Sequence, residues 1–266
     1  MNLHSKILTT IFLFLIVTFA YSQEQKFTRA DTLRGSITPE REWWDLNYYH
    51  LAVEVFPETK SIKGTNTVRY QVKKEHQVLQ IDLQEPLRII DATQDGQKLE
   101  IRKEGAAHFI HLLKKQVLGS FEEVIISYEG QPKEAIRPPW DGGITWTKDS
   151  NGKPFIASSN QGIGSSIWWP LKDHPADEVD SLMISVTVPE GLMDISNGRL
   201  ISTKQLKDNT TTYTWQVTNP INNYGVNINI GDYVVFSEKY KGEKGILDCQ
   251  YYVLRNNLAK AKKQFQ

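Results

Sequence analysis

The sequence has very little cysteine: Cys249 is the only one among 266 residues. A single cysteine cannot form a disulfide within the chain, so the fold has to be stabilised by its hydrophobic core. With 39% hydrophobic residues, the chain has enough apolar side chains for such a core. There is also no excess charge of either sign, because lysine plus arginine and aspartate plus glutamate both number 31. We therefore expect no binding to nucleic acid or to a charged membrane surface.

Zinc-binding motifs are missing as well. None of the six histidines stands in H-E-x-x-H, the helical spacing that places two imidazoles on one zinc ion with a glutamate beside them. His108 and His111 are three apart in a predicted strand and so face opposite ways, which predicts two ordinary sheet-surface histidines. His174 lies in an acidic segment, residues 173–180, where we expect a structural hydrogen-bond network. The histidine pattern thus predicts no metal ligand in this chain.

The one long apolar run is at the N-terminus. It extends from Ile7 to Tyr21 behind Lys6, and it is shorter than the ~20 residues that a membrane-spanning helix needs. Ala20 and Ser22 place small residues where a signal peptidase reads the chain. We expect residues 1–22 to be a signal peptide cleaved after Ser22. The protein is then predicted to be exported to the periplasm or beyond, without a stable membrane anchor.

Alternating apolar residues dominate the middle of the chain. Residues 48–255 show many short strand patterns separated by turn residues, with a tight hairpin signal at Asp95-Gly96 and no helical period. This pattern predicts an all-β domain, an antiparallel β-sandwich or saddle. Residues 23–47 precede it as an N-terminal arm, whose polar part up to Arg41 we expect to be loosely held. The strands are predicted near residues 51–55, 62–72, 78–83, 87–92, 98–102, 108–113, 124–128, 182–188, 212–217, 226–230, 233–236 and 247–254.

A helical pattern replaces the strand pattern at the C-terminal end. Leu258, Ala261 and Phe265 fall on one helical face after a possible cap at Asn256-Asn257. A helix of only about two turns is marginal by itself and needs a surface to pack against. We therefore expect residues 256–266 to be the truncated start of a further domain, so that this chain is a fragment.

The most informative stretch is Asn160–Ser181. It combines Gly162 and Gly164 with a Trp168-Trp169-Pro170 sequence and lacks any regular period, which predicts an ordered irregular loop. Loops of this kind on a β scaffold are where functional sites tend to lie. From residue types alone, the favoured interpretation is a loop fixed by buried tryptophans with a solvated acidic rim.

The same stretch resembles the aminopeptidase N family of zinc metallopeptidases, peptidase family M1. In that family a glutamine or glutamate precedes a loop of the type P-C-x-D-x-P. Gln161 stands at the substrate-contacting position, and PLKDHP at residues 170–175 follows at the family's distance, with Leu171 in place of a cysteine that is not a metal ligand. Residues 138–162 and 219–234 also resemble secreted bacterial members, so the likeness covers most of the chain.

The resemblance implies the N-terminal portion of an exported zinc aminopeptidase that removes N-terminal residues from peptides. It implies that Gln161 binds the N-terminus of the peptide substrate and that Asn160 and, more weakly, Ser159 line the same cleft. The alternative for Gln161 is a side chain that only ties down its glycine-rich loop. The zinc ion, its H-E-x-x-H motif and the G-x-M-E-N segment would belong to a C-terminal catalytic domain missing here. This chain alone is then expected to bind no zinc and to be inactive.

Two other classes of protein stay open at this point. One is a complete secreted β-sandwich module that binds peptides or carbohydrates through exposed tryptophans. The other is a glycoside hydrolase, whose two carboxylates would face each other at ~5 Å or at ~6.5–9.5 Å across a cleft. The candidate carboxylates for that chemistry are Asp141, Asp173, Asp177 and Glu178.

Overall fold

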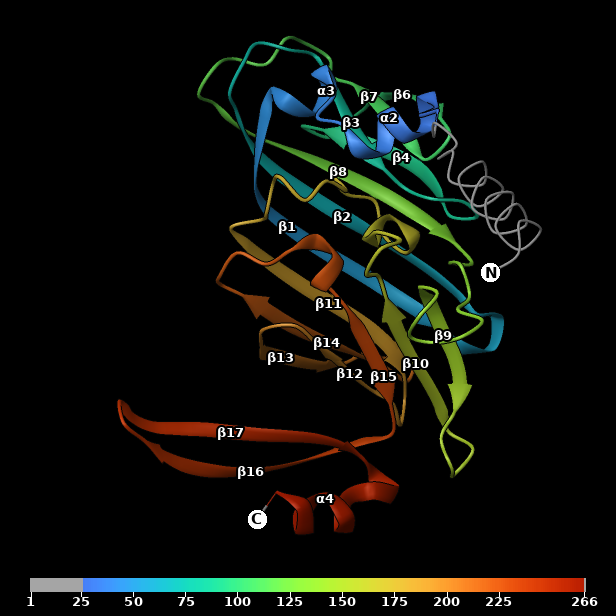
Figure 1. Cartoon of the computed structure of the whole chain (residues 1–266), viewed down its shortest axis with the longest axis vertical. Coiled ribbons are helices and arrows are strands. Elements are labelled where there is room, and N and C mark those ends of the chain that lie inside the picture. Colours follow the sequence, from blue (N-terminus) through green and yellow to red (C-terminus); the bar gives the residue numbers. More distant parts are fainter. Residues whose placement is uncertain (1–25, 266) are drawn as a thin grey trace, which may run out of the picture.

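The computed structural model describes residues 26–265 and consists mostly of β-strands (Figure 1). The predicted signal peptide, residues 1–22, lies outside the described residues. The largest sheet has eight strands in the order β13-β14-β11-β1-β2-β8-β4-β5. Its strands are β1 (Trp44–Phe56), β2 (Ser61–Val72), β4 (Arg88–Gln94), β5 (Gln97–Lys98), β8 (Phe121–Gly130), β11 (Ser181–Pro189), β13 (Arg199–Gln205) and β14 (Thr210–Val217).

Three smaller sheets complete the fold. A three-stranded sheet contains β3 (Val78–Asp82), β6 (Glu100–Glu104) and β7 (Ala107–His111). A four-stranded sheet contains β9 (Gly143–Lys148), β10 (Pro154–Ser159), β12 (Met193–Ser196) and β15 (Ile228–Gly231). The third is the hairpin of β16 (Tyr233–Gly242) and β17 (Gly245–Leu254). The helices are short: α2 (Arg29–Gly35), α3 (Pro39–Glu42), α4 (Leu258–Gln264), and the 3-10 turns η1 (Pro57–Thr59), η2 (Ser165–Ile167), η3 (Asn223–Gly225) and η4 (Arg255–Asn257).

The predicted all-β fold with antiparallel sheets is confirmed. Alternating apolar residues predict strand β11 correctly, because its side chains are alternately half-buried and buried along its whole length. The Asp95-Gly96 hairpin is also as predicted: both residues have positive φ, 51° and 74°, and they join β4 to β5. One pairing differs from the antiparallel expectation, since β1 and β11 run parallel. The other strand pairs among the described residues are antiparallel.

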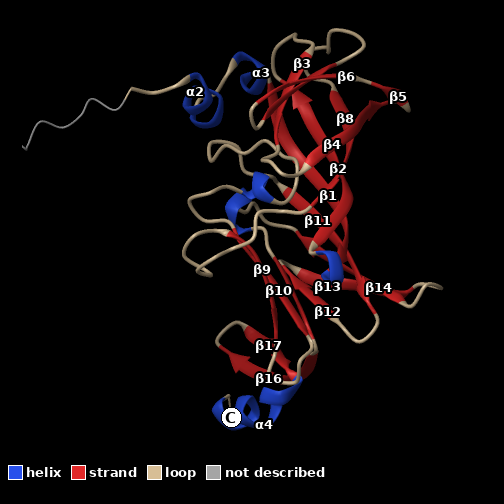
Figure 2. Cartoon of the chain, turned by 90° about the vertical axis from the view of Figure 1, so that its right-hand side faces the viewer, coloured by secondary structure: helices blue, strands red, loops and turns tan. Residues whose placement is uncertain are grey.

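One hydrophobic core connects the eight-stranded sheet to the segment after β10. Trp168 and Trp169 are fully buried in it, and the ring of Trp169 meets the ring of Tyr49 edge-on at 5.0 Å between centroids. This packing places the irregular Asn160–Ser181 stretch firmly against β1. Figure 2 shows α2 and the loops near β9 and β10 on the same side of the long strands. Within residues 26–265, no helix is long and apolar enough to cross a membrane.

The prediction of a loosely held polar arm before the β domain is wrong. Thr28 and Asp31 form a capping box that starts α2, and β1 begins at Trp44, inside the expected arm. Trp43 and Trp44 are buried, and the Arg41 side chain is only 1% exposed. The physical reason is that Arg41 pairs with the buried carboxylate of Asp82. This partner is distant in the chain, so the polarity of the local sequence does not reveal it.

Candidate functional site

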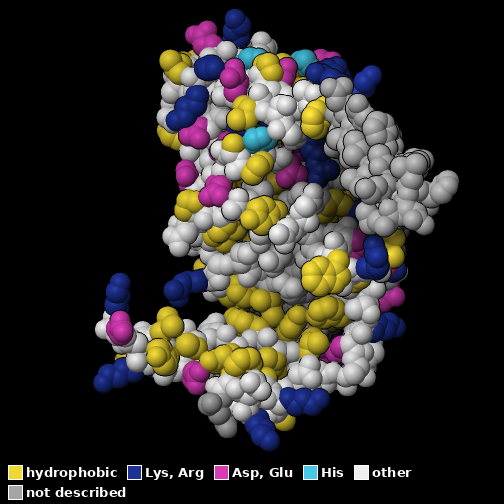
Figure 3. Space-filling view, viewed as in Figure 1, with side chains coloured by type: hydrophobic (Ala, Val, Ile, Leu, Met, Phe, Trp, Pro, Cys, Tyr) yellow, Lys and Arg dark blue, Asp and Glu magenta, His cyan; other side chains and the backbone are white. Residues whose placement is uncertain are grey.

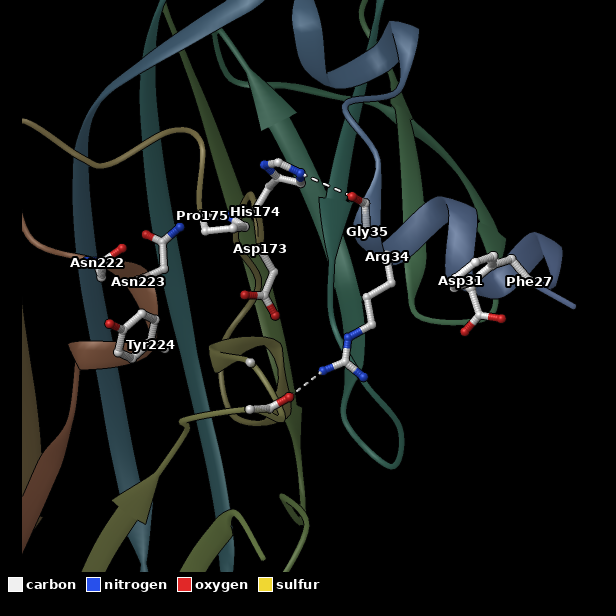
Figure 4. A pocket seen from close by; sticks show the side chains of 12 residues that line it. Phe27, Asp31, Arg34, Gly35, Asp173, His174, Pro175, Asn222, Asn223 and Tyr224 are labelled. Atoms are coloured by element: carbon white, nitrogen blue, oxygen red, sulfur yellow. Dashed lines mark hydrogen bonds between the residues drawn. The ribbon is translucent and has the colours of Figure 1, made fainter. Parts of the chain in front are cut away.

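A cavity of about 380 Å³ lies between helix α2 and the Asn160–Ser181 stretch (Figure 4). Its lining comes from three separate parts of the chain. They are residues between 27 and 35 around α2, residues 162, 164 and 173–175 of the irregular stretch, and the η3 region at 222–224. Three segments distant in sequence therefore meet here, at the loop where the sequence placed a functional site.

Gln161 lies in the turn directly after β10, and its side chain is exposed. It is not among the cavity-lining residues, but its neighbour Gly162 is. The other two candidates are less open. Asn160 is only 4% exposed and donates from Nδ2 to the carbonyl oxygen of Val226 at 2.6 Å, whereas Ser159 is half-buried at the end of β10. Of the three predicted residues, Gln161 is thus the one that presents its side chain to solvent.

The backbone of this turn depends on glycine. Gly162 and Gly164 have φ of +79° and +87°, a region that other residues rarely adopt. A Cβ on Gly164 would also lie 2.3 Å from Oδ2 of Asp173. The turn is closed by a hydrogen bond from the Gly164 amide to the Asn160 carbonyl at 2.8 Å. The sequence Asn-Gln-Gly-Ile-Gly therefore encodes a specific bend that carries Gln161.

The acidic loop after Trp169 forms the structural network that the sequence predicts. Oδ2 of Asp173 accepts from the Ser166 hydroxyl at 2.6 Å. The ammonium of Lys172, only 5% exposed, pairs with Asp177 and donates to the Trp44 carbonyl at 2.7 Å. Burial lowers the pKa of Lys172, while Asp177 opposes that effect. These groups brace the loop against β1.

His174 belongs to the same network. Its Nδ1 accepts from the Ala176 amide at 3.1 Å, and its Nε2 lies 3.4 Å from the Gly35 carbonyl oxygen (Figure 4). Both ring nitrogens therefore have backbone partners, and one of these partners, Gly35, is the last residue of α2.

The prediction that His108 is an ordinary sheet-surface histidine is wrong. His108 is 4% exposed, and burial lowers its pKa to about 4, so that its neutral form predominates at physiological pH. The reason is that Ala107–Ile110 in β7 are all buried, so both faces of the strand are covered there, which alternation within one strand does not reveal. In the part of the chain that the structure describes, no three His, Cys, Asp or Glu residues converge as metal ligands.

Asp141 and the tryptophans are the residues that bear on the two alternative classes, the glycoside hydrolase and the β-sandwich binding module. Asp141 accepts backbone N–H groups of Ile136 and Arg137 at 2.7 and 3.0 Å, so this carboxylate ties a loop together. Trp168 and Trp169 are buried, and Trp140, at 88% exposure, is the large exposed tryptophan that a carbohydrate module would need. Of these carboxylates and tryptophans, Asp173 lines the cavity beside α2, whereas Asp141, Asp177, Glu178 and Trp140 do not.

Solved structures with the same fold are zinc metallopeptidases. One is an M1 zinc metallopeptidase mutant from Deinococcus radiodurans bound to a Tyr-Ser-Ala substrate, with a TM-score of 0.69 and 18% identity over 83% of this chain and 50% of that chain. Another is an M1 zinc metallopeptidase from the same organism, with a TM-score of 0.67 and 18% identity over 79% of this chain and 48% of that chain. The chain spans about half the length of these structures. Their likeness shows the fold class: these metallopeptidase chains contain the β-rich fold of this chain.

A family model identifies the family itself. The model described as the peptidase M1 N-terminal domain matches residues 46–224, which is more than half of the sequence. The chain therefore belongs to the M1 peptidase family. A search of curated proteins gives no match.

Proposed function

We propose that this chain is the N-terminal, non-catalytic part of a zinc aminopeptidase and that Gln161 contacts the N-terminus of the peptide substrate. The observation that carries the proposal is the exposed Gln161 side chain on a glycine-dependent turn, inside the region that matches the M1 family. An enzyme that removes terminal residues has to recognise a free amino group. Polar acceptors placed around that group reject blocked peptides, because the groups of the site would then be left unpaired.

Zinc chemistry belongs, in this proposal, to the rest of the peptidase. The described residues do not fit a zinc site, since no three suitable donors converge among them. The metal, the catalytic base and most of the pocket for the first substrate residue would lie in a catalytic domain. The part played by this chain is to supply Gln161, held at a fixed place on a rigid β scaffold.

The β16–β17 hairpin offers a surface for that catalytic domain. Among the described residues the two strands pair only with each other, so both outer edges of the hairpin are open within this part of the chain. Tyr240 and Leu247 stand opposite each other and are 61% and 56% exposed. Helix α4 reaches the same hairpin through Phe265, whose ring stacks on Tyr251 at 5.1 Å. Figure 3 shows hydrophobic side chains gathered over this hairpin.

Such a surface is unfavourable when it is left uncovered. Open strand edges and a contiguous apolar face favour association with another chain. We therefore expect the chain produced alone to self-associate in a concentration-dependent way. The double variant Tyr240→Ser with Leu247→Ser should associate at least about tenfold more weakly, because each replacement removes apolar area that association would bury.

Analytical ultracentrifugation checks this prediction. The control is Ile201→Ser, which removes an exposed apolar side chain, 50% exposed, from β13 in the large sheet. A chain that stays monomeric at all concentrations, or a double variant that associates like the control, would contradict the proposed docking surface.

The substrate role of Gln161 is tested in the complete peptidase. Gln161→Ala should lower kcat/KM for peptides with a free amino terminus by about 10–100-fold, because a hydrogen bond to a charged group contributes about 1.5–3 kcal/mol. Gln161→Glu should retain most of the activity, since a carboxylate accepts the same ammonium protons. Gln97→Ala, at the tip of the exposed β4–β5 hairpin, is the matched control.

Two results would contradict the proposal. One is a kcat/KM for Gln161→Ala that equals that of Gln97→Ala. The other is peptide cleavage by the chain produced alone, which would place the catalytic groups in this half of the protein.

A further inference from the structure

Helix α2 is hydrogen-bonded to the Gln161 turn by the side chain of Arg34. Arg34 is in the last turn of α2, and its Nη2 donates to the carbonyl oxygen of Ile163 at 2.6 Å and to that of Gly162 at 3.2 Å. Figure 4 shows the guanidinium of Arg34 extending from α2 toward this turn across the cavity. The two carbonyls directly follow Gln161 in the chain, so their position determines where the Gln161 backbone lies.

The two bonded carbonyls differ in their other supports: the Ile163 side chain packs against the hydrophobic core, whereas Gly162 has no side chain to hold it. Gly162 is exposed, and its positive φ leaves the peptide free of the usual steric limits. The Ile163 carbonyl has one further side-chain donor, Nε2 of Gln84, at 2.8 Å. Hydrogen bonds from a charged guanidinium are shorter and roughly twice as strong as bonds between neutral groups. Arg34 therefore adds charge-assisted hydrogen bonds to both carbonyls, beside the bond from Gln84 and the packing of Ile163.

Helix α2 itself is held in place by other residues. Leu33 is 5% exposed, and its carbonyl accepts from Nε2 of Gln80 at 3.0 Å. The segment after α2 is tied down by Arg41, whose Nη1 donates to the Ser36 carbonyl at 2.8 Å. Loss of the Arg34 guanidinium would thus free the turn without detaching the helix.

We propose that Arg34 is a positioning residue that fixes the Gln161 turn and thereby sets where Gln161 meets the peptide substrate. The inference rests on the proposed function. It makes the N-terminal helix, which precedes the residues matched by the family model, a part of the substrate site. Arg34 does not touch the substrate; it acts through the backbone of residues 162 and 163.

A double-mutant cycle in the complete peptidase tests the proposal. Arg34→Ala should lower kcat/KM for unblocked peptides about tenfold, because a small displacement of a binding group is costly. Arg34→Lys, which keeps one charged donor, should restore part of this loss. In a Gln161→Ala background, Arg34→Ala should have no further effect, because the two residues act as one unit. Arg29→Ala is the control, since Arg29 lies on the same helix but pairs with Glu104 at the surface.

The possible outcomes separate the two proposals. If Gln161→Ala leaves kcat/KM unchanged, the substrate role of Gln161 fails, and the role of Arg34 fails with it. If Gln161→Ala lowers kcat/KM but Arg34→Ala does not, or if the two losses multiply in the double variant, only the role of Arg34 is overturned.

A second measurement needs no activity and uses the chain alone. Hydrogen exchange of the amides at residues 162–165 should become at least several-fold faster in Arg34→Ala than in Arg29→Ala, while the amides of β10 stay unchanged. Equal exchange in the two variants would show that Arg34 does not order the turn, and the inference would be wrong.

Discussion

Arg41→Ala is expected to lower the free energy of unfolding by about 3–5 kcal/mol, the range found when one partner of a buried ion pair is removed. The side chains of Arg41 and Asp82 are only 1% and 7% exposed, and they are directly bonded. Burial raises the pKa of Asp82, and Arg41 opposes that rise. Without Arg41, a buried carboxylate would keep only the neutral donors around it, among them Nε2 of Gln80 at 3.0 Å.

Urea denaturation of the chain measures this effect. Lys60→Ala is a suitable control, because the Lys60–Glu134 pair is about half exposed on both sides and such surface pairs contribute about 0–1 kcal/mol. Replacing both partners, as in Arg41→Met with Asp82→Leu, should cost less than Arg41→Ala alone, because no charge is then left buried. A loss below about 1 kcal/mol for Arg41→Ala would contradict this account of how the N-terminal helices are attached.

The second large effect is a dependence of stability on pH that arises from Asp194. This residue, in β12, is fully buried, and burial raises its pKa from 3.8 to about 8, with the Ser196 hydroxyl at 2.9 Å opposing part of the rise. The folded protein therefore keeps a proton that the unfolded chain releases above pH 3.8. The contribution of Asp194 to stability is complete below that pH and is lost as the pH rises towards 8, by up to about 1.4 kcal/mol per pH unit.

Asp194→Asn should remove this slope. The amide has nearly the same shape and no charge, so at pH 8 the variant should be more stable than the original chain by a few kcal/mol, on the order of 3–5, and about equal to it near pH 4. Denaturant unfolding at pH 5, 6.5 and 8 measures the difference. Asp208→Asn serves as the control, because Asp208 is exposed on the turn between β13 and β14. Parallel pH profiles for Asp194→Asn and the original chain would rule out Asp194 as the cause.

Hydrophobic periodicity predicts β11 and β14 but not β9 and β10. β11 and β14 have one face in the core, so their apolar residues alternate and are visible in the sequence. β9 and β10 lack such alternation, because only a few of their residues are buried, and they flank glycine-rich turns. The sequence pattern of these residues therefore resembles a loop, although β9 and β10 are two strands of the four-stranded sheet, and Gln161 follows the end of β10.

The candidate site was predictable only in part. Gln161 could be named from its place before a glycine-rich loop, because that resemblance follows the order of residues along the chain. Arg34 could not, since the carbonyls that it binds are 128 and 129 residues away. No local pattern distinguishes an arginine that holds a distant turn from one that is solvated at the end of a helix.

The sequence by itself determined the features that depend on neighbouring residues. Alternation specified most strands, Asp95-Gly96 specified a tight hairpin through its positive φ angles, and Gly162 and Gly164 specified an irregular turn after Gln161. Only the tertiary structure decided which charged groups meet and which become buried, as with Arg41 beside Asp82. The physical reason is that burial and pairing energies depend on distances between groups far apart in the chain, and those distances exist only after the sheets have packed.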